Sequence, residues 1–572
     1  MTETNSGPVI ENDNELTIRV GDRSLIETDG RTIGEVFEEA VGRYGANPFL
    51  IVPRDPKRAY YPDGVTITFG DAGQMVADYV ASLRRAGYGH GHRIAVLLEN
   101  RPSVLLLKIA FNTLGVSWVP INPDYRPGEI AYLLDDSNAD LIITVASHAA
   151  NVKEGIAKSG AESRRKVPLV IFDEQGTGEI PLPDAARPPP ANDDVRPQTE
   201  ASLLYTSGTT GRPKGCILGH EYELMMGVWY ASRGGLLSLD EGCERVYSPL
   251  PLFHINTGII LFYGMLVSGN CMIAPERFSR SRWWSEIRQT EATGMHYLGV
   301  VIPVLINEPA REQDRQHKLR WGLGAGVEPS LHAAFENRFG FPLVEVWGMT
   351  EMCRILANCR EPRQIDTRAM GRPVDGLEVR VVDGDDGDVL TGEPGEMVIR
   401  YSSATPRKGF FSGYLNKSEE TEEAWRGGWF HTGDTVAQDK SGMIYFVDRK
   451  KNIIRRSGEN IAAAEVEACL QAHESVGQVA VIPIVDEMRD EEVMACVVTA
   501  NGAKTKGAEL ARELFKHCNA QLTYYKSPGW VVFVDALPVT GTQKVLKHMI
   551  FGEDQDPREL PDAHDLRVLK KR

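Results

Sequence analysis

The sequence has no apolar stretch long enough to cross a lipid bilayer. Its longest strongly apolar run, GIILFYGMLV from Gly258, has ten residues, whereas a membrane-spanning helix needs about 20. The first residues, MTETNSGPVIENDNE, are polar and acidic and lack the apolar core of a secretory signal. The run from Gly258 is therefore expected to form a buried helix, and the protein is expected in the cytoplasm.

An excess of basic residues is also absent. Lys and Arg total 63 against 79 Asp and Glu, which gives a formal net charge of -16 and a pI of about 5.4. A nucleic-acid-binding protein needs a basic face, so this class is disfavoured. Hydrophobic content of 42% and charged content of 25% are ordinary globular values, and they suit a protein with small-molecule ligands.

Cysteine is scarce. The eight cysteines include no CxxC pair, and their neighbours are mostly apolar. A zinc site and a disulfide framework are both disfavoured on this pattern. The cysteines are expected to be reduced and packed in the interior.

The chain of 572 residues is longer than one hydrophobic core usually serves, so two or more domains are expected. Residues 32–45 and 70–89 have helical spacing, residues 93–100 form an apolar strand pattern, and the same order recurs further on. Strands that alternate with helices predict parallel sheets with helices on both faces. After about residue 375, short alternating strands indicate a small β subdomain.

A second, smaller domain is predicted at the end of the chain. After the charged run at 445–461, the patterns read helix, strand, strand, helix and strand. We predict an α/β N-terminal domain of doubly wound sheets with the β subdomain over residues 1–448. Residues 449–572 are predicted to form a small α+β domain.

The segment YTSGTTGRPKG, residues 205–215, is rich in glycine and hydroxyl residues and cannot pack as a core helix or central strand. Apolar residues on both sides predict two flanking strands. Backbone N–H groups of such a loop form a concave anion site, and Lys214 adds a positive charge. A Walker A loop is disfavoured because Gly215, not Ser or Thr, follows Lys214. The loop's hydroxyl donors are Thr206, Ser207, Thr209 and Thr210.

This segment resembles the phosphate-binding signature of the adenylate-forming superfamily, which includes acyl-CoA synthetases, adenylation domains of peptide synthetases and luciferases. Seven further family motifs follow in order: PLFHINTG, GLGAG, VWGMTE, GEPGEMVIR, WFHTGD, DRKKNIIRRSGENI and PVTGTQKVLK. The resemblance thus covers nearly the whole chain. It implies an ATP-dependent carboxylic acid–CoA ligase, in which carboxylate and ATP give acyl-AMP and diphosphate. Attack by the CoA thiol then gives acyl-CoA and AMP.

The chemistry explains why such a site needs cations and donors. A carboxylate is a poor electrophile, and its attack on the α-phosphate of ATP brings two anions together. The resemblance accordingly implies ATP, Mg²⁺ and CoA. The residues that match the family's ATP and AMP contacts are Thr206, Ser207, Gly208, Thr209, Thr210, Lys214, Gly324, Ala325, Gly326, Trp347, Gly348, Met349, Thr350, Asp434 and Arg449.

Individual roles follow from the resemblance. Thr350 is expected to hydrogen-bond the α-phosphate as a catalytic residue. Glu351, with Thr206, is expected to hold Mg²⁺, a hard cation that prefers carboxylate and phosphate oxygens. Asp434 offers two acceptor oxygens to the ribose hydroxyls, and Arg449 matches the arginine that also reaches the ribose.

Trp347 stands where relatives often carry a tyrosine whose ring lies against adenine, and tryptophan offers a larger face. The expected acyl pocket contains His254, Gly324 and Arg354. His254 is grouped with the catalytic residues, although it is not assigned as a general base because the carboxylate arrives ionised. Arg354 is a candidate partner for a second carboxylate on the acid.

Lys544 matches the family lysine that bridges the carboxylate and the α-phosphate during adenylation, although its motif reads TQK where relatives often read TGK. Lys451 aligns best with the family hinge. Rotation of the C-terminal domain about it would withdraw Lys544 and bring Ser457, Gly458 and Glu459 towards a pantetheine tunnel.

The substrate remains open at this stage. The segments DRKKNIIRRSGENIAAAEVE and DEMRDEEVMACVV look most like the crotonobetaine/carnitine–CoA ligase branch. Trp229, Tyr230 and Tyr297 are available to cage a quaternary ammonium group. No carrier-protein domain follows the lysine motif, which favours free CoA as acceptor, in a monomer or homodimer. The alternatives are a luciferase-like oxidase that uses an acyl-adenylate and a non-catalytic nucleotide-binding protein.

Overall fold

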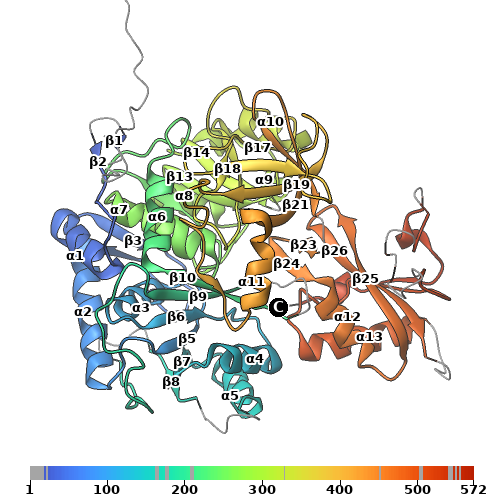
Figure 1. Ribbon diagram of the computed structural model, residues 1–572, viewed down its shortest axis with the longest axis horizontal. Helices are drawn as coiled ribbons and strands as arrows, with labels where there is room; N and C mark the ends of the chain where they lie inside the picture. Colours follow the sequence, from blue (N-terminus) through green and yellow to red (C-terminus); the bar gives the residue numbers. More distant parts are fainter. Residues whose placement is uncertain are drawn as a thin grey trace, which may run out of the picture.

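Two large sheets with their helices form most of the molecule, and a smaller unit follows them in the chain. The computed structural model describes residues 19–20, 23–160, 167–173, 180–206, 212–299, 301–327, 329–449, 453–500, 507–538, 545, 547, 550–552 and 555–571. In Figure 1 the larger part runs from blue to orange, and the smaller unit, in orange and red, lies beside it at the right.

The first large sheet carries the predicted phosphate loop. Five of its strands, β5, β6, β7, β8 and β9, pair in parallel, whereas β10 pairs antiparallel with both β9 and β20. The strand order is β20 (Gly413–Tyr414), β10 (Lys214–Gly219), β9 (Glu200–Thr206), β6 (Ser117–Pro120), β5 (Arg93–Leu97), β7 (Leu141–Thr144) and β8 (Leu169–Ile171).

The second large sheet carries the glycine motif and the VWGMTE motif at the ends of adjacent parallel strands. Only its outermost pairs, β15 with β16 and β3 with β4, are antiparallel. Its order is β16 (Leu356–Ala357), β15 (Leu343–Trp347), β14 (Trp321–Ala325), β13 (Gly294–Leu298), β11 (Arg245–Tyr247), β12 (Cys271–Ile273), β3 (Pro48–Val52) and β4 (Val65–Thr68).

Two helices of the larger part begin with a capping signal that the sequence carries. Thr32 and Thr68 each form a capping box at the start of α1 and α2, which satisfies backbone donors that a helix leaves free. The helices are α1 (Ile33–Tyr44), α2 (Phe69–Arg85), α3 (Pro102–Thr113), α4 (Pro127–Ser137), α5 (Ala149–Lys158), α6 (His220–Ala231), α7 (Phe262–Val267), α8 (Trp283–Gln289), α9 (Val301–Ile306), α10 (Pro329–Phe339) and α11 (Ser418–Ala424). The π-helix η1 (Asn256–Leu261) leads into α7.

The small β subdomain is an antiparallel sheet that supplies the WFHTGD motif. Its order is β17 (Ala369–Gly371), β22 (Ile444–Arg449), β21 (Phe430–Gln438), β19 (Gly395–Arg400) and β18 (Glu378–Val382). The terminal unit has strands β24 (Glu459–Ala462), β23 (Ile453–Arg456), β26 (Asp490–Thr499), β27 (Trp530–Phe533) and β28 (Ala563–Asp565), with β25 (Val476–Asp486) paired to β26 and helices α12 (Ala463–Gln471) and α13 (Ala508–Gln521). The predicted fold class is confirmed.

The terminal unit packs on α4 of the larger part through a buried lysine. Lys526 Nζ lies 2.8 Å from Glu129 Oε1 in α4 and 2.9 Å from Glu465 Oε1 in α12. Burial would lower the pKa of Lys526, but the two carboxylates hold it well above its usual value. Asn122 Nδ2 also donates to the hydroxyl of Tyr525 at 3.1 Å. The two parts thus meet through charged and polar contacts.

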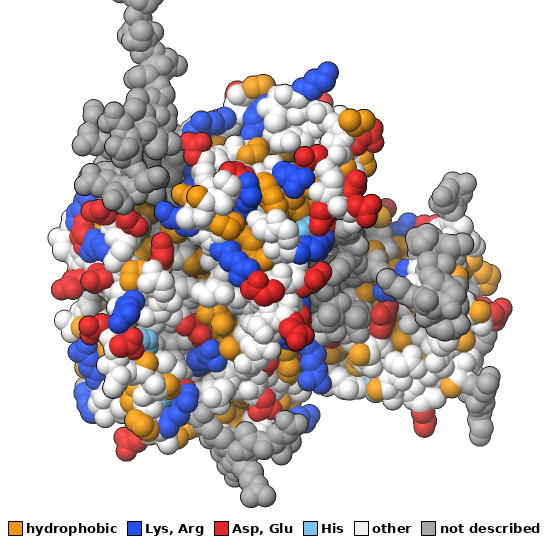
Figure 2. All heavy atoms as spheres, viewed as in Figure 1, with side chains coloured by type: hydrophobic (Ala, Val, Ile, Leu, Met, Phe, Trp, Pro, Cys, Tyr) orange, Lys and Arg blue, Asp and Glu red, His pale blue; other side chains and the backbone are white. Residues whose placement is uncertain are grey.

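Three expectations on composition can now be compared with the structure. The apolar run from Gly258 is buried, as predicted, in η1 and α7, and no helix within the described ranges has the length and apolar character needed to cross a bilayer. All eight cysteines are free, but Cys243 is exposed, contrary to the packed interior that was expected. Figure 2 shows acidic side chains interspersed with basic ones over the coloured part of the face drawn.

Candidate active site

The two strands predicted around the phosphate loop form an antiparallel hairpin in which Thr206 pairs with Lys214. Ser207, Gly208, Thr209 and Thr210 lie outside the described residues. Lys214 forms an ion pair with Glu420 of α11, and its Nζ lies 4.9 Å from the centre of the Tyr414 ring. The hairpin therefore delivers a positive charge to the end of the loop.

Glu351 is a buried carboxylate in the turn that follows β15, with 6% of the residue exposed. The hydroxyl of Tyr414 donates to its Oε1 at 2.8 Å, and the Cys216 thiol also lies within hydrogen-bonding reach of the carboxylate. Burial raises the pKa of Glu351, as does the charge of Asp434, while the hydrogen bond from Tyr414 and the charge of Lys214 oppose that rise. Residues from three separate motifs, Lys214, Glu351 and Asp434, thus lie within electrostatic reach of one another.

Thr350 is fixed through its backbone, because the hydroxyl of Tyr222 in α6 donates to its carbonyl oxygen at 2.8 Å. Gly348 sits in a tight site, since an added Cβ would lie 2.2 Å from Ile355 Cγ2. Met349 packs against the core as a partly buried residue. This turn therefore has little freedom at the point where a phosphate contact is expected.

The predicted ribose residues lie opposite each other on adjacent strands. Asp434 in β21 pairs with Arg449 in β22. The indole Nε1–H of Trp347 donates to Asp434 Oδ2 at 2.8 Å, and Trp347 is buried, with 7% exposed. Trp347 therefore orients the carboxylate that is expected to bind the ribose hydroxyls, a role that no sequence motif indicated.

This contact gives the first testable prediction. Trp347→Phe keeps an aromatic ring but removes the N–H that holds Asp434, so KM for ATP is expected to rise about three- to tenfold. Steady-state AMP formation at varied ATP measures it. Trp347→Tyr provides the control for the aromatic face, and unchanged KM in both variants would contradict a positioning role for the indole.

The glycine motif lines the end of β14. A Cβ on Gly324 would lie 2.3 Å from the carbonyl oxygen of Tyr297, and Gly326 has a φ of +85°. Gly326 N–H donates to Glu345 Oε2 at 2.8 Å. Only glycine tolerates the close approach at position 324 and the left-handed backbone at position 326. Gly324, Ala325 and Gly326 therefore end β14 with little side-chain bulk.

The SGEN segment of the terminal unit reaches this edge. His254 Nε2 lies 3.7 Å from Glu459 Oε2, and a Cβ on Gly458 would lie 2.3 Å from Leu298 Cδ1. Burial alone would raise the pKa of Glu459, but the hydrogen bond and charge of His254, together with Lys526, hold it below its ordinary value. Ser457, at φ 50°, precedes this contact.

Arg354 contacts the small β subdomain. Its guanidinium donates to the carbonyl oxygen of Asp375 at 2.8 Å and lies 5.0 Å from the centre of the Tyr401 ring. Within the described part of the chain, the buried Nε of Arg354 has no hydrogen-bond partner. Arg233 is close enough for the two positive charges to repel, although burial is the larger reason that the pKa of Arg233 is lowered to about 10.

The three aromatic residues considered for a cationic cage do not form one. Tyr297 donates to Glu345 Oε1 at 2.6 Å and packs in a different core cluster from the other two. Tyr230 instead contacts His296. Lys544 and Lys451 lie outside the described residues.

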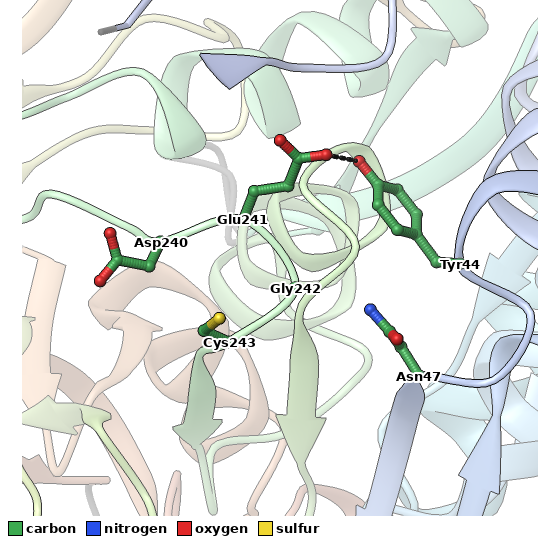
Figure 3. Close-up of a pocket in the computed structure, with 6 residues that line it drawn as sticks. All are labelled: Tyr44, Asn47, Asp240, Glu241, Gly242 and Cys243. Atoms are coloured by element: carbon green, nitrogen blue, oxygen red, sulfur yellow. Dashed lines mark hydrogen bonds between the residues drawn. The ribbon is translucent and has the colours of Figure 1, made fainter. Parts of the chain in front are cut away.

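A surface hollow of about 490 Å³ is lined by none of the motif residues, and Figure 3 shows the residues that do line it. It is lined by Tyr44, Asn47, Asp240, Glu241, Gly242 and Cys243. Tyr44 ends α1, Asn47 precedes β3 and the other lining residues precede β11. The hollow therefore lies at the amino ends of the parallel strands, whereas ligands in such sheets bind at the carboxyl ends. Glu241 already accepts from Tyr44 at 2.8 Å.

A dedicated all-protein metal cage is absent from the described residues, since no three His, Cys, Asp or Glu side chains gather to hold an ion. A single buried carboxylate nevertheless fits Mg²⁺, which usually takes one or two carboxylates and completes its shell with water and substrate phosphates. Glu351 is a buried carboxylate of this kind.

Three residues that contact the predicted site were not predicted from the sequence: Tyr414, Glu420 and Tyr222. Tyr414 bonds Glu351, Glu420 pairs with Lys214, and Tyr222 bonds the Thr350 carbonyl. None of them belongs to a recognised motif. A tyrosine or glutamate that reaches the site only through tertiary packing leaves no local signal.

Comparison with known proteins places this geometry in a family. The model for AMP-binding enzymes matches residues 37–415, and that for the AMP-binding enzyme C-terminal domain matches residues 465–544. A sulfoacetate–CoA ligase of Cupriavidus necator is 30% identical over 533 residues, which cover 90% of this chain and 98% of the relative. A crotonobetaine/carnitine–CoA ligase of Citrobacter koseri is 30% identical over 475 residues, 81% of this chain and 88% of the relative.

Solved structures share the fold. A double mutant of o-succinylbenzoate–CoA synthetase from Bacillus subtilis, bound to the product analogue OSB-NCoA, superposes with a TM-score of 0.75 at 24% identity, covering 90% of this chain and 97% of that one. The same enzyme with its acyl-adenylate intermediate OSB-AMP gives 0.61 at 25% identity, covering 90% and 98%.

The chain therefore belongs to the family of AMP-binding enzymes, as the motifs predicted. Its curated relatives are CoA ligases. These matches confirm the predicted reaction class, an ATP-dependent, AMP-forming ligation of a carboxylic acid to CoA.

Proposed function

We propose that one group of the predicted residues serves acyl-adenylate formation and that a second group serves thioester formation. Lys214 and the loop at 207–210 bind the phosphates, Thr350 donates to the α-phosphate, and Asp434 with Arg449 holds the ribose. Glu351 and Thr206 would hold Mg²⁺, which supplies positive charge to the phosphate oxygens. The observation that carries the proposal is the meeting of Lys214, Glu351 and Asp434 from three distant motifs.

The second half-reaction is assigned to the terminal unit. We propose that residues 449–572 form a mobile domain, hinged at Lys451, that carries Lys544 and the CoA tunnel of Ser457, Gly458 and Glu459. The contacts of Gly458 with Leu298 and of Glu459 with His254 support a pose for thioester formation. The higher TM-score to the synthetase with a CoA-type product analogue than to its acyl-adenylate complex supports the same pose.

The acid itself is proposed to carry a second polar group. One relative acts on sulfoacetate, whose sulfonate is a second negative charge. Among the described residues, the buried Nε of Arg354 has no partner and no carboxylate pairs with its guanidinium. These features support Arg354 as a candidate to bind that group, with His254 and Gly324 lining the same acyl pocket.

Arg354→Ala is expected to raise KM for a dicarboxylic or sulfonated acid about tenfold or more, because a charge-assisted hydrogen bond is lost. KM for a monocarboxylic acid of equal length should change little. Initial rates of AMP formation for the matched acids provide the measurement. Equal effects on both acids would remove Arg354 from the acyl pocket.

We also propose that the enzyme is a cytoplasmic monomer or homodimer.

Two alternatives to the ligase are testable. A luciferase-like oxidase would consume oxygen after adenylation, and a non-catalytic nucleotide-binding protein would bind ATP without turnover. Oxygen uptake and ATP affinity separate these from a ligase.

The test of the proposed function is AMP formation from ATP with a panel of acids, each assayed with and without CoA and Mg²⁺. The panel spans short aliphatic, betaine, aryl, dicarboxylic and sulfonated acids. AMP release that requires one acid, CoA and Mg²⁺ is the expected result. Absence of AMP with every acid would overturn it.

A further inference from the structure

Asn256 opens the π-helix η1, two residues after His254, and its side chain is partly exposed. A π-helical turn is rare and often marks a functional site. The Asn256 side chain contacts His296 of β13. His296 and Leu298 lie on the same face of that strand, because side chains alternate along it. Since Leu298 meets Gly458 of the terminal unit, Asn256 lies just below the proposed entry of the CoA thiol.

A buried chain of hydrogen bonds holds the Asn256 amide. His296 Nδ1 lies 2.6 Å from Asn256 Oδ1, and His296 Nε2 lies 2.9 Å from the hydroxyl of Tyr230 in α6. His296 is fully buried and Tyr230 is 2% exposed. Among the described residues, neither side chain has another hydrogen-bond partner.

The donor and the acceptor in each of these hydrogen bonds follow from the need to satisfy buried donors. The only acceptor near the Tyr230 hydroxyl within the described residues is His296 Nε2, so Tyr230 donates to it. Burial lowers the pKa of His296 to about 3, so the ring is neutral at physiological pH and carries its single proton on Nδ1. Nδ1–H then donates to Asn256, whose amide oxygen must be the accepting atom.

This arrangement fixes the orientation of Nδ2, the amide nitrogen of Asn256. With Oδ1 turned towards His296, the Nδ2 group of Asn256 points away from the core, and it has no hydrogen-bond partner among the described residues. A carboxamide NH₂ is a donor only. Tyr230 and His296 therefore present an oriented, uncharged donor beside His254, in the region proposed for the acyl pocket.

We propose that the Nδ2 group of Asn256 selects acids that carry a hydrogen-bond acceptor, such as a carbonyl oxygen, on the acyl chain. This inference rests on the proposed function of the site and adds a substrate class to it. A purely hydrocarbon acid would bury Nδ2 without a partner. A site built to hydrogen-bond its substrate discriminates strongly against an analogue that lacks the group.

The test uses matched acids of similar shape in which a ketone oxygen replaces a methyl group. Suitable pairs are 4-oxopentanoate with 4-methylpentanoate, 5-oxohexanoate with 5-methylhexanoate, and 4-acetylbenzoate with 4-isopropylbenzoate. The ketone oxygen is uncharged, so these pairs do not test the role proposed for Arg354. The measured quantity is the ratio of kcat/KM for the ketone acid to that for its methyl analogue.

For the wild-type enzyme, this ratio is expected to be about ten or more in at least one pair. Asn256→Leu, which is close in size but has no donor, should bring the ratio to about one or below. Its activity with the methyl acid should persist, which also shows that the variant folds. Tyr230→Phe should lower the ratio partly, because His296 is then free to take the other tautomer and release the amide.

Two outcomes overturn the inference. One is a wild-type ratio near one in every pair that is turned over, and the other is a ratio that Asn256→Leu leaves unchanged. A uniform loss of activity with ketone and methyl acids alike in Asn256→Leu would show a structural role only. Absence of AMP from wild-type enzyme with every acid tested would instead remove the proposed function, and the inference with it.

Discussion

Replacing Lys544 with alanine is expected to slow acyl-adenylate formation about a hundredfold or more, the usual effect of removing an electrostatic group from a transition state. The reacting carboxylate and the α-phosphate are both anions, and the lysine ammonium would neutralise charge on both. Conversion of preformed acyl-adenylate to the CoA thioester should change little. Lys544 lies outside the described residues, so the prediction depends on its place in the PVTGTQKVLK motif.

The two half-reactions can be measured separately. Diphosphate release reports the first, and consumption of synthetic acyl-adenylate by CoA reports the second. Lys547→Ala is the matched control, because Lys547 lies in the same motif but bonds the Val481 carbonyl at 2.9 Å and Glu467 at 2.7 Å. Both rates should remain near wild type in that control. An equal fall of both half-reactions in Lys544→Ala would contradict an alternating domain.

The sequence was informative where a structural or chemical need leaves a local pattern. The strands on either side of the phosphate loop were predicted from apolar residues next to a segment that cannot be regular, and they form the hairpin of β9 and β10. The buried run from Gly258 was predicted from its length and composition. The resemblance to the adenylate-forming superfamily implied that Glu351 and Asp434 would share a site, and the charge of Asp434 does act on Glu351.

Residues that act through tertiary contact could not be predicted in this way. Trp347 was expected to lie against adenine, and its hydrogen bond to Asp434 depends on how β15 meets the small β subdomain. Tyr414 reaches Glu351 only because β20 pairs with β10. His296 and Asn256 are 40 positions apart and meet through the π-helical turn. No local periodicity encodes such pairs.

The charged contacts between the two parts have a consequence for the proposed rotation. Lys526 is 4% exposed, and its two carboxylate partners belong to different parts of the chain, Glu129 to α4 and Glu465 to α12. Rotation of the terminal unit would separate Lys526 from Glu129, and a buried charge that loses a partner is costly unless water reaches it. This contact therefore favours the pose seen here and must be offset by ligand binding in the adenylation pose.

Gly458 is proposed to act in thioester formation, whereas Lys544 is proposed to act in adenylation. Gly458→Val is expected to slow thioester formation from preformed acyl-adenylate about a hundredfold, because displacement of reacting groups by an ångström has effects of that size. An added Cβ would lie 2.3 Å from Leu298 Cδ1, and the φ of +85° disfavours any residue with a side chain. The terminal unit could then no longer approach β13 as closely. Adenylation should remain near wild type, since that half-reaction is proposed to use the other pose.

Steric exclusion can be distinguished from local unfolding by a second change at the same contact. Leu298→Ala removes the side chain that the new Cβ meets, so Gly458→Ala should lose less thioester formation in the Leu298→Ala background than alone. The backbone strain at φ +85° is the same in both backgrounds and sets the residual loss. An equal loss in both backgrounds, or a fall in adenylation that matches the fall in thioester formation, would show that Gly458 does not act at the contact with Leu298. The substitutions at Lys544 and Gly458 are thus expected to slow different half-reactions. This result requires the terminal unit to present two different faces to the same bound acyl group in turn.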